Sequence, residues 1–238
     1  MKHPITKNLT LLNKAVFIED LKILVLSDIH IGYEESLNKS GILIPRTQFQ
    51  QTMDEIQEII EELPKIEKII ILGDLKHEFG KISNQEWNET LEFLRVLENK
   101  SKEIILIKGN HDTILGPIAE RKSIVLRQIH QEGKYLFLHG DKVVPELNDK
   151  KIETIFIGHM HPAIQLREGT KSEKYKCFLV GENKKKNIIV LPSFFPLIEG
   201  TDNWNMHEKI FNEIKLDNFQ VYAIEDQVYS LGKRKNIS

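Results

Sequence analysis

The sequence is poor in cysteine, with Cys177 alone among its 238 residues. One cysteine cannot form an internal disulfide, and it cannot supply the several thiolates of a cysteine-based zinc site. No apolar run approaches the roughly 18–20 residues that a membrane-spanning helix needs. The first ten residues, MKHPITKNLT, contain no apolar core of signal-peptide length. We therefore expect a protein of the reducing cytoplasm that has no membrane partner.

The chain also lacks a strong charge of either sign. Its formal net charge is −2, from 33 Lys and Arg against 35 Asp and Glu. This balance provides no overall attraction to nucleic acid, so binding of a polyanion would depend on local patches and bound cations. The composition, 40% hydrophobic and 29% charged, is typical of a soluble globular protein.

No internal repeat or low-complexity linker divides the chain, so we predict one domain over residues 1–238. Apolar runs typical of strands alternate with segments of helical spacing at 46–63 and 86–98. Further strand-like segments lie at 124–129, 135–138 (a hairpin with the preceding segment), 174–181, 187–191 and 220–231. This order predicts an α/β fold of two mixed β-sheets packed face to face and flanked by helices. Residues 162–238 would complete the second sheet.

Five apolar runs end in residues whose side chains are metal ligands. These residues are Asp28 and His30, Asp74, Asn110 to Asp112, His139, and His159 with His161. In open α/β sheets, ligands bind at the carboxyl ends of the strands. Asp, Asn and His offer the oxygen and imidazole donors that suit borderline divalent metals. Each residue alone could cap a helix or accept a backbone hydrogen bond, but their joint occurrence favours a metal site.

The spacing within the motifs suggests how they would work. We expect Asp28 and His30 to point to the same side, because side chains alternate along extended backbone. The glycine before Asp74 would let the chain turn and direct one carboxylate into the crevice. One carboxylate can bridge two cations, and metals roughly 3.5–4 Å apart suit in-line displacement at phosphorus.

In this order, the elements D-x-H, G-D, G-N-H-D, H and G-H-x-H resemble the calcineurin-like metallophosphoesterase superfamily over residues 22–161. The resemblance implies a four-layer sandwich and two divalent metal ions, manganese first, with iron, zinc or nickel as alternatives. It also implies a hydrolase in which metal-activated water attacks a phosphoester. Residues 28–34, 73–77, 159–162 and 191–198 further resemble the Icc-like branch related to the SbcD-type repair nucleases.

The resemblance assigns a role to each matching residue. The metal ligands would be Asp28, His30 and His161 for the first metal, Asp74 as the bridge, and Asn110, His139 and His159 for the second. His111 would be catalytic, by stabilising charge on the phosphoryl oxygens or by protonating the leaving oxygen. Asp112 would act with His111, by orienting it or stabilising its charge. His77 could bind substrate at the rim of the site or be a polar loop residue.

Two basic segments and one aromatic pair could either bind substrate or have an ordinary structural role. The lysine-rich turn at 184–186 and the basic residues 233–235 could touch phosphates or face solvent. Phe194 and Phe195 could stack on a base or pack against the end of a sheet.

Three functions remain open on the sequence alone. The first is a metal-dependent phosphodiesterase that acts as a nuclease on single-stranded DNA or RNA. The second is a small-molecule phosphodiesterase or phosphatase acting on a nucleotide or cyclic nucleotide. The third is a metal-holding interaction subunit of a larger complex. The sequence leaves the oligomeric state open, a homodimer included.

Overall fold

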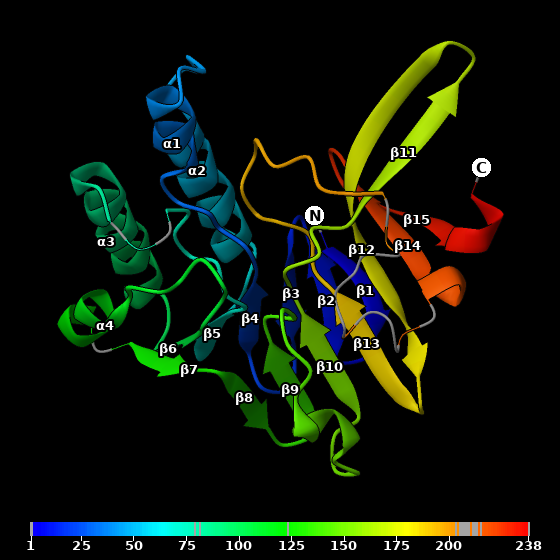
Figure 1. The fold of residues 1–238 in the computed structure, drawn as a ribbon. Coiled ribbons are helices and arrows are strands. Elements are labelled where there is room, and N and C mark those ends of the chain that lie inside the picture. Colours follow the sequence, from blue (N-terminus) through cyan, green and yellow to red (C-terminus); the bar gives the residue numbers. More distant parts are fainter. Residues whose placement is uncertain are drawn as a thin grey trace.

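The computed structural model describes residues 2–78, 80, 82–122, 124–202, 204, 210, 214 and 216–237. Within these residues, two β-sheets lie face to face, and helices α1 to α4 lie on the outside of the first sheet (Figure 1). This arrangement confirms the predicted α/β fold of two mixed sheets flanked by helices. In the described part of the chain, no helix has the length and apolar character needed to cross a membrane.

The first sheet is antiparallel at one side and parallel at the other. In spatial order its strands are β1 (Lys2–Thr6), β2 (Leu9–Leu12), β3 (Ala15–Ile18), β4 (Ile23–Leu26), β5 (Lys68–Ile71), β6 (Glu103–Ile107) and β7 (Val125–Arg127). Pairing is antiparallel from β1 to β4 and parallel from β4 to β7. The parallel strands β4 to β6 are almost continuously apolar because both of their faces are covered.

The second sheet contains the C-terminal strands. In spatial order they are β15 (Val228–Lys233), β14 (Gln220–Ile224), β12 (Lys171–Asn183), β13 (Lys186–Val190), β10 (Thr154–Ile157), β9 (Tyr135–Leu138) and β8 (Ile129–Glu132). Strands β9, β10 and β13 are parallel, so their carboxyl ends meet at one edge. Strand β11 (Ala163–Glu168) pairs with the first part of β12, and this hairpin projects from the body (Figure 1).

The helices match the predicted ones closely where apolar periodicity was strong. They are α1 (Tyr33–Lys39), α2 (Gln48–Glu61), α3 (Asn84–Glu98) and α4 (Gly116–Lys122), with 3₁₀ turns at Pro145–Asn148, Leu216–Asn218 and Arg234–Asn236. Helix α2 buries Ile56, Ile59 and Ile60 against the first sheet. Helix α3 begins after Ser83, whose hydroxyl accepts a hydrogen bond from the backbone N–H of Glu86.

Two expectations about the strands need correction. The segment 124–129 does not form one hairpin strand, because Val125–Arg127 pairs with β6 of the first sheet and Ile129–Glu132 pairs with β9 of the second. The chain passes from one sheet to the other at this point. Strands β1 to β3 and helix α1 were not predicted, since each is short and lacks a long periodic pattern.

The space between the sheets is filled by apolar side chains from both. Phe137 and Phe156 stack there with ring centroids 5.0 Å apart and an interplanar angle of 8°, and Phe178 packs in the same cluster. Aromatic side chains of this size contribute much of the burial that holds two layers together. This packing brings the carboxyl ends of β4 to β6 and of β9 and β10 to a common edge.

Candidate dinuclear metal site

The common edge of the two sheets carries the residues that the motifs predict. Each lies one to four residues beyond the end of a strand: Asp28 and His30 after β4, Asp74 after β5, Asn110 after β6, His139 after β9, and His159 and His161 after β10. The structure therefore brings together side chains that are up to 133 residues apart in the chain, from Asp28 to His161. They form two neighbouring ligand sets.

The first ligand set consists of Asp28, His30 and His161. The Oδ1 atom of Asp28 lies 3.1 Å from Nε2 of His161, and Nε2 of His30 lies 3.4 Å from the same nitrogen. One ligand atom from each residue falls within 4.8 Å of the others. Two imidazoles and one carboxylate that converge in this way are a suitable donor set for a divalent cation.

The second ligand set consists of Asp74, Asn110, His139 and His159. The Nε2 atom of His139 lies 3.0 Å from Oδ1 of Asn110 and 3.1 Å from Nδ1 of His159. The Nδ1–H group of His139 donates to the carbonyl oxygen of Leu72 at 2.7 Å. This hydrogen bond fixes the tautomer and leaves Nε2 as the ligand atom, as is usual for metal-binding histidines.

Asp74 lies between the two sets. Its Oδ2 atom is 3.8 Å from Nε2 of His30 and 3.4 Å from Nε2 of His139. Its Oδ1 atom accepts a hydrogen bond from the backbone N–H of His111 at 2.9 Å. Gly73 is required beside it, because a Cβ atom there would lie 2.5 Å from Nδ1 of His139. Asp74 therefore lies within reach of both ligand sets.

The backbone at the ligands differs from the extended form that the motif spacing suggested. Five ligand residues have left-handed backbone: Asp28 (φ 52°), His30 (50°), Asp74 (48°), His159 (65°) and His161 (46°). The side chains within each motif do converge, but alternation along a strand is not the reason. Left-handed backbone at such residues costs on the order of 1–3 kcal/mol each and is found at functional sites whose surroundings enforce it.

Electrostatics within the site reflect crowding of acids and imidazoles. Burial opposes ionisation of Asp28, but the adjacent His161 and His139 outweigh it and lower the pKa of Asp28. Burial also favours neutral His139, yet its hydrogen bond to Asp74 and the charge of Asp28 raise the pKa of His139 to about 9. In contrast, burial followed by the charge of His161 lowers the pKa of His30 well below its ordinary value. A proton on His139 therefore competes with a cation for the same lone pair.

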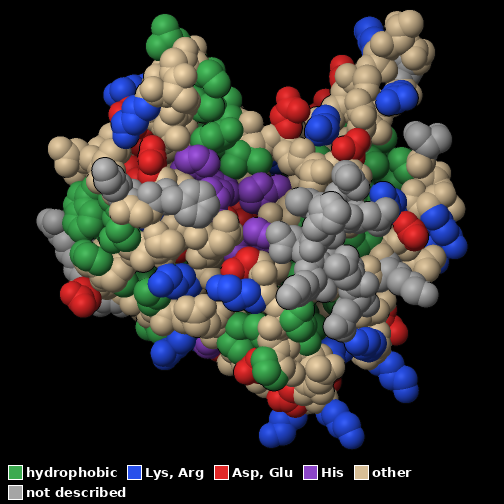
Figure 2. Space-filling view, viewed as in Figure 1, with side chains coloured by type: hydrophobic (Ala, Val, Ile, Leu, Met, Phe, Trp, Pro, Cys, Tyr) green, Lys and Arg blue, Asp and Glu red, His purple; other side chains and the backbone are tan. Residues whose placement is uncertain are grey.

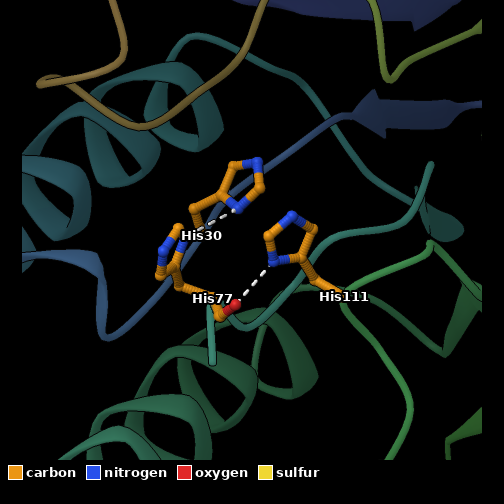
Figure 3. Close-up of side chains that lie close together, drawn as sticks. All are labelled: His30, His77 and His111. Carbon is orange, nitrogen blue, oxygen red and sulfur yellow. Dashed lines mark hydrogen bonds between the residues drawn. The ribbon is translucent and has the colours of Figure 1, made fainter. Parts of the chain in front are cut away.

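His30, His77 and His111 converge beside the first ligand set (Figure 3). The Nδ1–H group of His111 donates to the carbonyl oxygen of His77 at 2.5 Å, which fixes the orientation of the ring. The His30 and His111 ring centroids are 5.0 Å apart. His77 places Nδ1 3.5 Å from Nδ1 of His30 and packs on Tyr33 at 4.2 Å between centroids. Burial, then the charge of His111, lowers the pKa of His77 to about 4.

Asp112 is fully buried and connects two loops of the site. Its carboxylate accepts hydrogen bonds from the backbone N–H groups of Leu75 at 3.1 Å and Gly109 at 3.0 Å. Burial, followed by the nearby charge of Asp74, raises the pKa of Asp112 to about 7. These contacts join the loop that carries Asn110 and His111 to the loop after β5.

Comparison with known proteins identifies the family. The model of the calcineurin-like phosphoesterase family matches residues 21–223. The chain belongs to the calcineurin-like phosphoesterase family. This family uses divalent metals, and the nitrogen and oxygen donors of the two ligand sets fit such ions. Membership indicates a hydrolase of phosphoester bonds.

Several solved structures are similar to this chain to different degrees. A nuclease, MPE, from Pseudomonas putida is 19% identical with a TM-score of 0.68, over 97% of this chain and 100% of that chain. The phosphoesterase YfcE from E. coli is 18% identical with a TM-score of 0.45, over 89% of this chain and 97% of that chain. Vacuolar protein sorting 29 from Cryptosporidium parvum is 18% identical with a TM-score of 0.38, over 89% of this chain and 92% of that chain. No curated protein matches the sequence.

One supporting residue of the phosphoesterase site was not predicted. The buried carboxylate of Glu86 accepts hydrogen bonds from the backbone N–H groups of His77 and Glu78, both at 3.0 Å. In the sequence, Glu86 follows Ser83 by three residues, a spacing typical of a helix capping box. The capping-box pattern accounts for a glutamate at the start of helix α3, but it does not predict that Glu86 binds the backbone of His77.

The remaining aromatic and basic features have structural contacts. Phe194 and Phe195 are buried, so they pack against the sheet end, and stacking on a base is excluded in this conformation. In the lysine-rich turn, the ammonium group of Lys186 donates to the carbonyl oxygen of Ile152 at 2.8 Å. Lys184 and Lys185 have left-handed backbone in the tight turn between β12 and β13.

Proposed function

We propose that the chain is a dinuclear metal-dependent phosphodiesterase that cleaves nucleic acid, with single-stranded DNA or RNA as its substrate. The observation that supports this best is the geometry of Asp74, whose Oδ2 atom lies 3.8 Å from His30 and 3.4 Å from His139. A carboxylate shared by two ligand sets is suited to a pair of divalent ions, with manganese as the first choice. Such a pair activates water and neutralises charge on a phosphate.

The residues of the chain would divide the remaining work. Asp28, His30 and His161 would hold one cation, Asn110, His139 and His159 would hold the other, and Asp74 would be shared by both. The Nε2 atom of His111 would donate a hydrogen bond to a phosphoryl oxygen or a proton to the leaving oxygen. Its other nitrogen is fixed by the His77 carbonyl, so the ring keeps its direction. His77 itself would contact substrate at the rim.

A polymeric substrate is supported by the shape of the surface. Figure 2 shows histidine side chains at the base of a recess between two projections, which Figure 1 identifies as the ends of α1 and α2 and the β11–β12 hairpin. A recess that is open to solvent between two projections can admit an extended chain. The P. putida protein with this fold is a nuclease, which supports the same substrate class here. The lone Cys177 is consistent with action in the cytoplasm.

A second candidate is a phosphodiesterase or phosphatase acting on a nucleotide or cyclic nucleotide. The net charge of −2 favours it, because proteins that bind polynucleotides usually have a strongly basic surface. In this case, the same site would act on a small substrate that needs few phosphate contacts outside the metal centre.

The experiment is a substrate panel with purified protein and Mn²⁺. It contains single-stranded and duplex DNA, RNA, cyclic nucleotides and bis-p-nitrophenyl phosphate. We expect Mn²⁺-stimulated cleavage of single strands that is lost in His111→Ala and kept in the control His130→Ala, a histidine on edge strand β8. Fast turnover of small diesters without polynucleotide cleavage would support the second candidate. Two bound metals without any hydrolysis would support a metal-holding subunit.

A further inference from the structure

The segment after β13, residues 192–196, contacts the backbone of Asp28. The hydroxyl of Ser193 donates to the carbonyl oxygen of Asp28 at 3.0 Å. The backbone N–H of Phe194 donates to the carbonyl oxygens of Ser27 at 3.0 Å and Asp28 at 3.1 Å. Ser193, Phe194 and Phe195 are buried, with exposures of 1%, 0% and 2%. This segment therefore fixes the carbonyl side of a metal ligand that has a left-handed backbone.

Two lysines hold the same segment, one from the turn between β2 and β3 and one from β12. The Nζ atom of Lys176 donates to the carbonyl oxygens of Ser193, at 2.9 Å, and Phe195. The Nζ atom of Lys14 donates to the carbonyl oxygen of Phe194 at 3.1 Å and forms an ion pair with Glu55. Three successive carbonyl groups thus receive hydrogen bonds from two amines. A buried carbonyl without a partner costs about 1–3 kcal/mol.

Burial of the two amines is itself unfavourable. It lowers the pKa of Lys176 well below its ordinary value, and the charge of Lys14 lowers it further. Burial also lowers the pKa of Lys14, against the opposing effect of Glu55. An apolar side chain at either position would avoid this desolvation cost. These two buried lysines, although unfavourable to bury, contact the segment that binds the backbone of Asp28.

We propose that Lys14 and Lys176 are positioning residues for the first metal. They fix residues 193–195, and this segment in turn holds Asp28 in the backbone conformation that directs its carboxylate toward His161. The linkage reaches the first ligand set through Asp28. Asp28 contacts the second set through the backbone N–H of His159, at 3.0 Å, but the His139 ring is fixed by its own bond to the Leu72 carbonyl. Loss of the lysine contacts should therefore weaken the first metal position more than the second.

The test is a Mn²⁺ titration of the purified full chain, with free Mn²⁺ followed by electron paramagnetic resonance. Lys176→Met keeps the length of the side chain and removes its donors. We expect the dissociation constant of one position to rise by about 10-fold or more, the usual effect of removing an outer partner of a ligand. The constant of the other position should change less, by about twofold at most, because Asp28 supplies no ligand there and contacts that set through the backbone N–H of His159.

Lys186→Met is a matched control. Lys186 also donates to two backbone carbonyls, those of Asp149 and Ile152. It lies at the first residue of β13, however, and the site lies beyond the other end of this strand. Lys186→Met should lower thermal stability and leave both metal constants unchanged. If Lys176→Met also lowers stability only, with both constants unchanged, the proposal is wrong.

Two further variants keep the proposal testable if Lys176→Met does not fold. Lys14→Met removes the contact with Phe194, and Ser193→Ala removes the direct bond to the Asp28 carbonyl without changing either lysine. Both should weaken the same metal position as Lys176→Met, and unchanged constants in both would overturn the proposal. The proposal about the two lysines rests on the two-metal site of the proposed function. Fewer than two metals in the unmodified protein would contradict that function, whereas two metals and unaffected variants would contradict this inference alone.

Discussion

Replacement of His111 by alanine tests the chemistry of the site. The structure fixes its ring through the hydrogen bond from Nδ1 to the His77 carbonyl, at 2.5 Å, and Nε2 is the nitrogen that we expect to act on substrate. A positioned acid or base typically contributes about 10²- to 10⁴-fold in rate. We therefore expect kcat to fall by about that factor, which corresponds to roughly 3–5 kcal/mol of transition-state stabilisation. Metal content should not change, because the backbone N–H that binds Asp74 is retained in His111→Ala.

The assay compares two leaving groups with the same variant. An alkyl phosphodiester, as in DNA, needs a proton on its leaving oxygen, whereas p-nitrophenolate leaves without one. If His111 is a general acid, the loss should be large for DNA and under about tenfold for bis-p-nitrophenyl phosphate. If it stabilises phosphoryl charge, the two losses should be similar. A loss below about tenfold with both substrates, at full metal occupancy, would refute a catalytic role for His111.

Three other outcomes follow from buried groups. Burial raises the pKa of Glu89 and its Oε2 atom has no hydrogen-bond partner among the described residues, so Glu89→Gln should stabilise the fold by roughly 1 kcal/mol at pH 7. The pKa of Glu89 in the folded state lies above the ordinary value of 4.5, so the cost of burying its charge grows as the pH rises above that value. Urea unfolding should therefore show little difference in stability between Glu89→Gln and the unmodified protein at pH 4. Glu92→Gln, at an exposed position, is the control. Cys177 is buried and burial raises its pKa, so a disulfide reagent should label it only after unfolding. Phe137→Ala should reduce the free energy of unfolding by about 3–5 kcal/mol, because the ring is fully buried between the sheets; a loss below about 1 kcal/mol would contradict the packing described.

The meeting of the candidate ligands at one edge could be predicted because each one lies within four residues of the end of an apolar run. The end of a buried strand is a local feature, and parallel strands bring their carboxyl ends together whatever the rest of the chain does. Helices α2 and α3 were predictable for a similar reason, since their apolar faces repeat over several turns. The left-handed backbone of Asp28 and His30 was not predictable. Contacts such as that between Asp28 and residue 194 enforce it, and these depend on the assembled fold.

Residues that support the site from a distance also left no sign in the sequence. Lys14 and Phe194 are 180 positions apart, and no spacing rule connects a turn near the start of the sequence with a segment so distant from it. The division of residues 124–132 between two sheets has the same origin. The apolar pattern predicts strands there, but the choice of partner is made by packing between the layers.

The most direct measurement is the number of metal ions per chain, determined by mass spectrometry of the metal content after loading with Mn²⁺ and removal of excess ion. Two ions per chain are expected for the unmodified protein. Asp28→Ala should retain about one ion, and Asp74→Ala should lose both, because one carboxylate oxygen of Asp74 lies near the ligand nitrogens of both sets. One ion in the unmodified protein, or two ions retained by Asp74→Ala, would contradict a dinuclear centre bridged by this carboxylate.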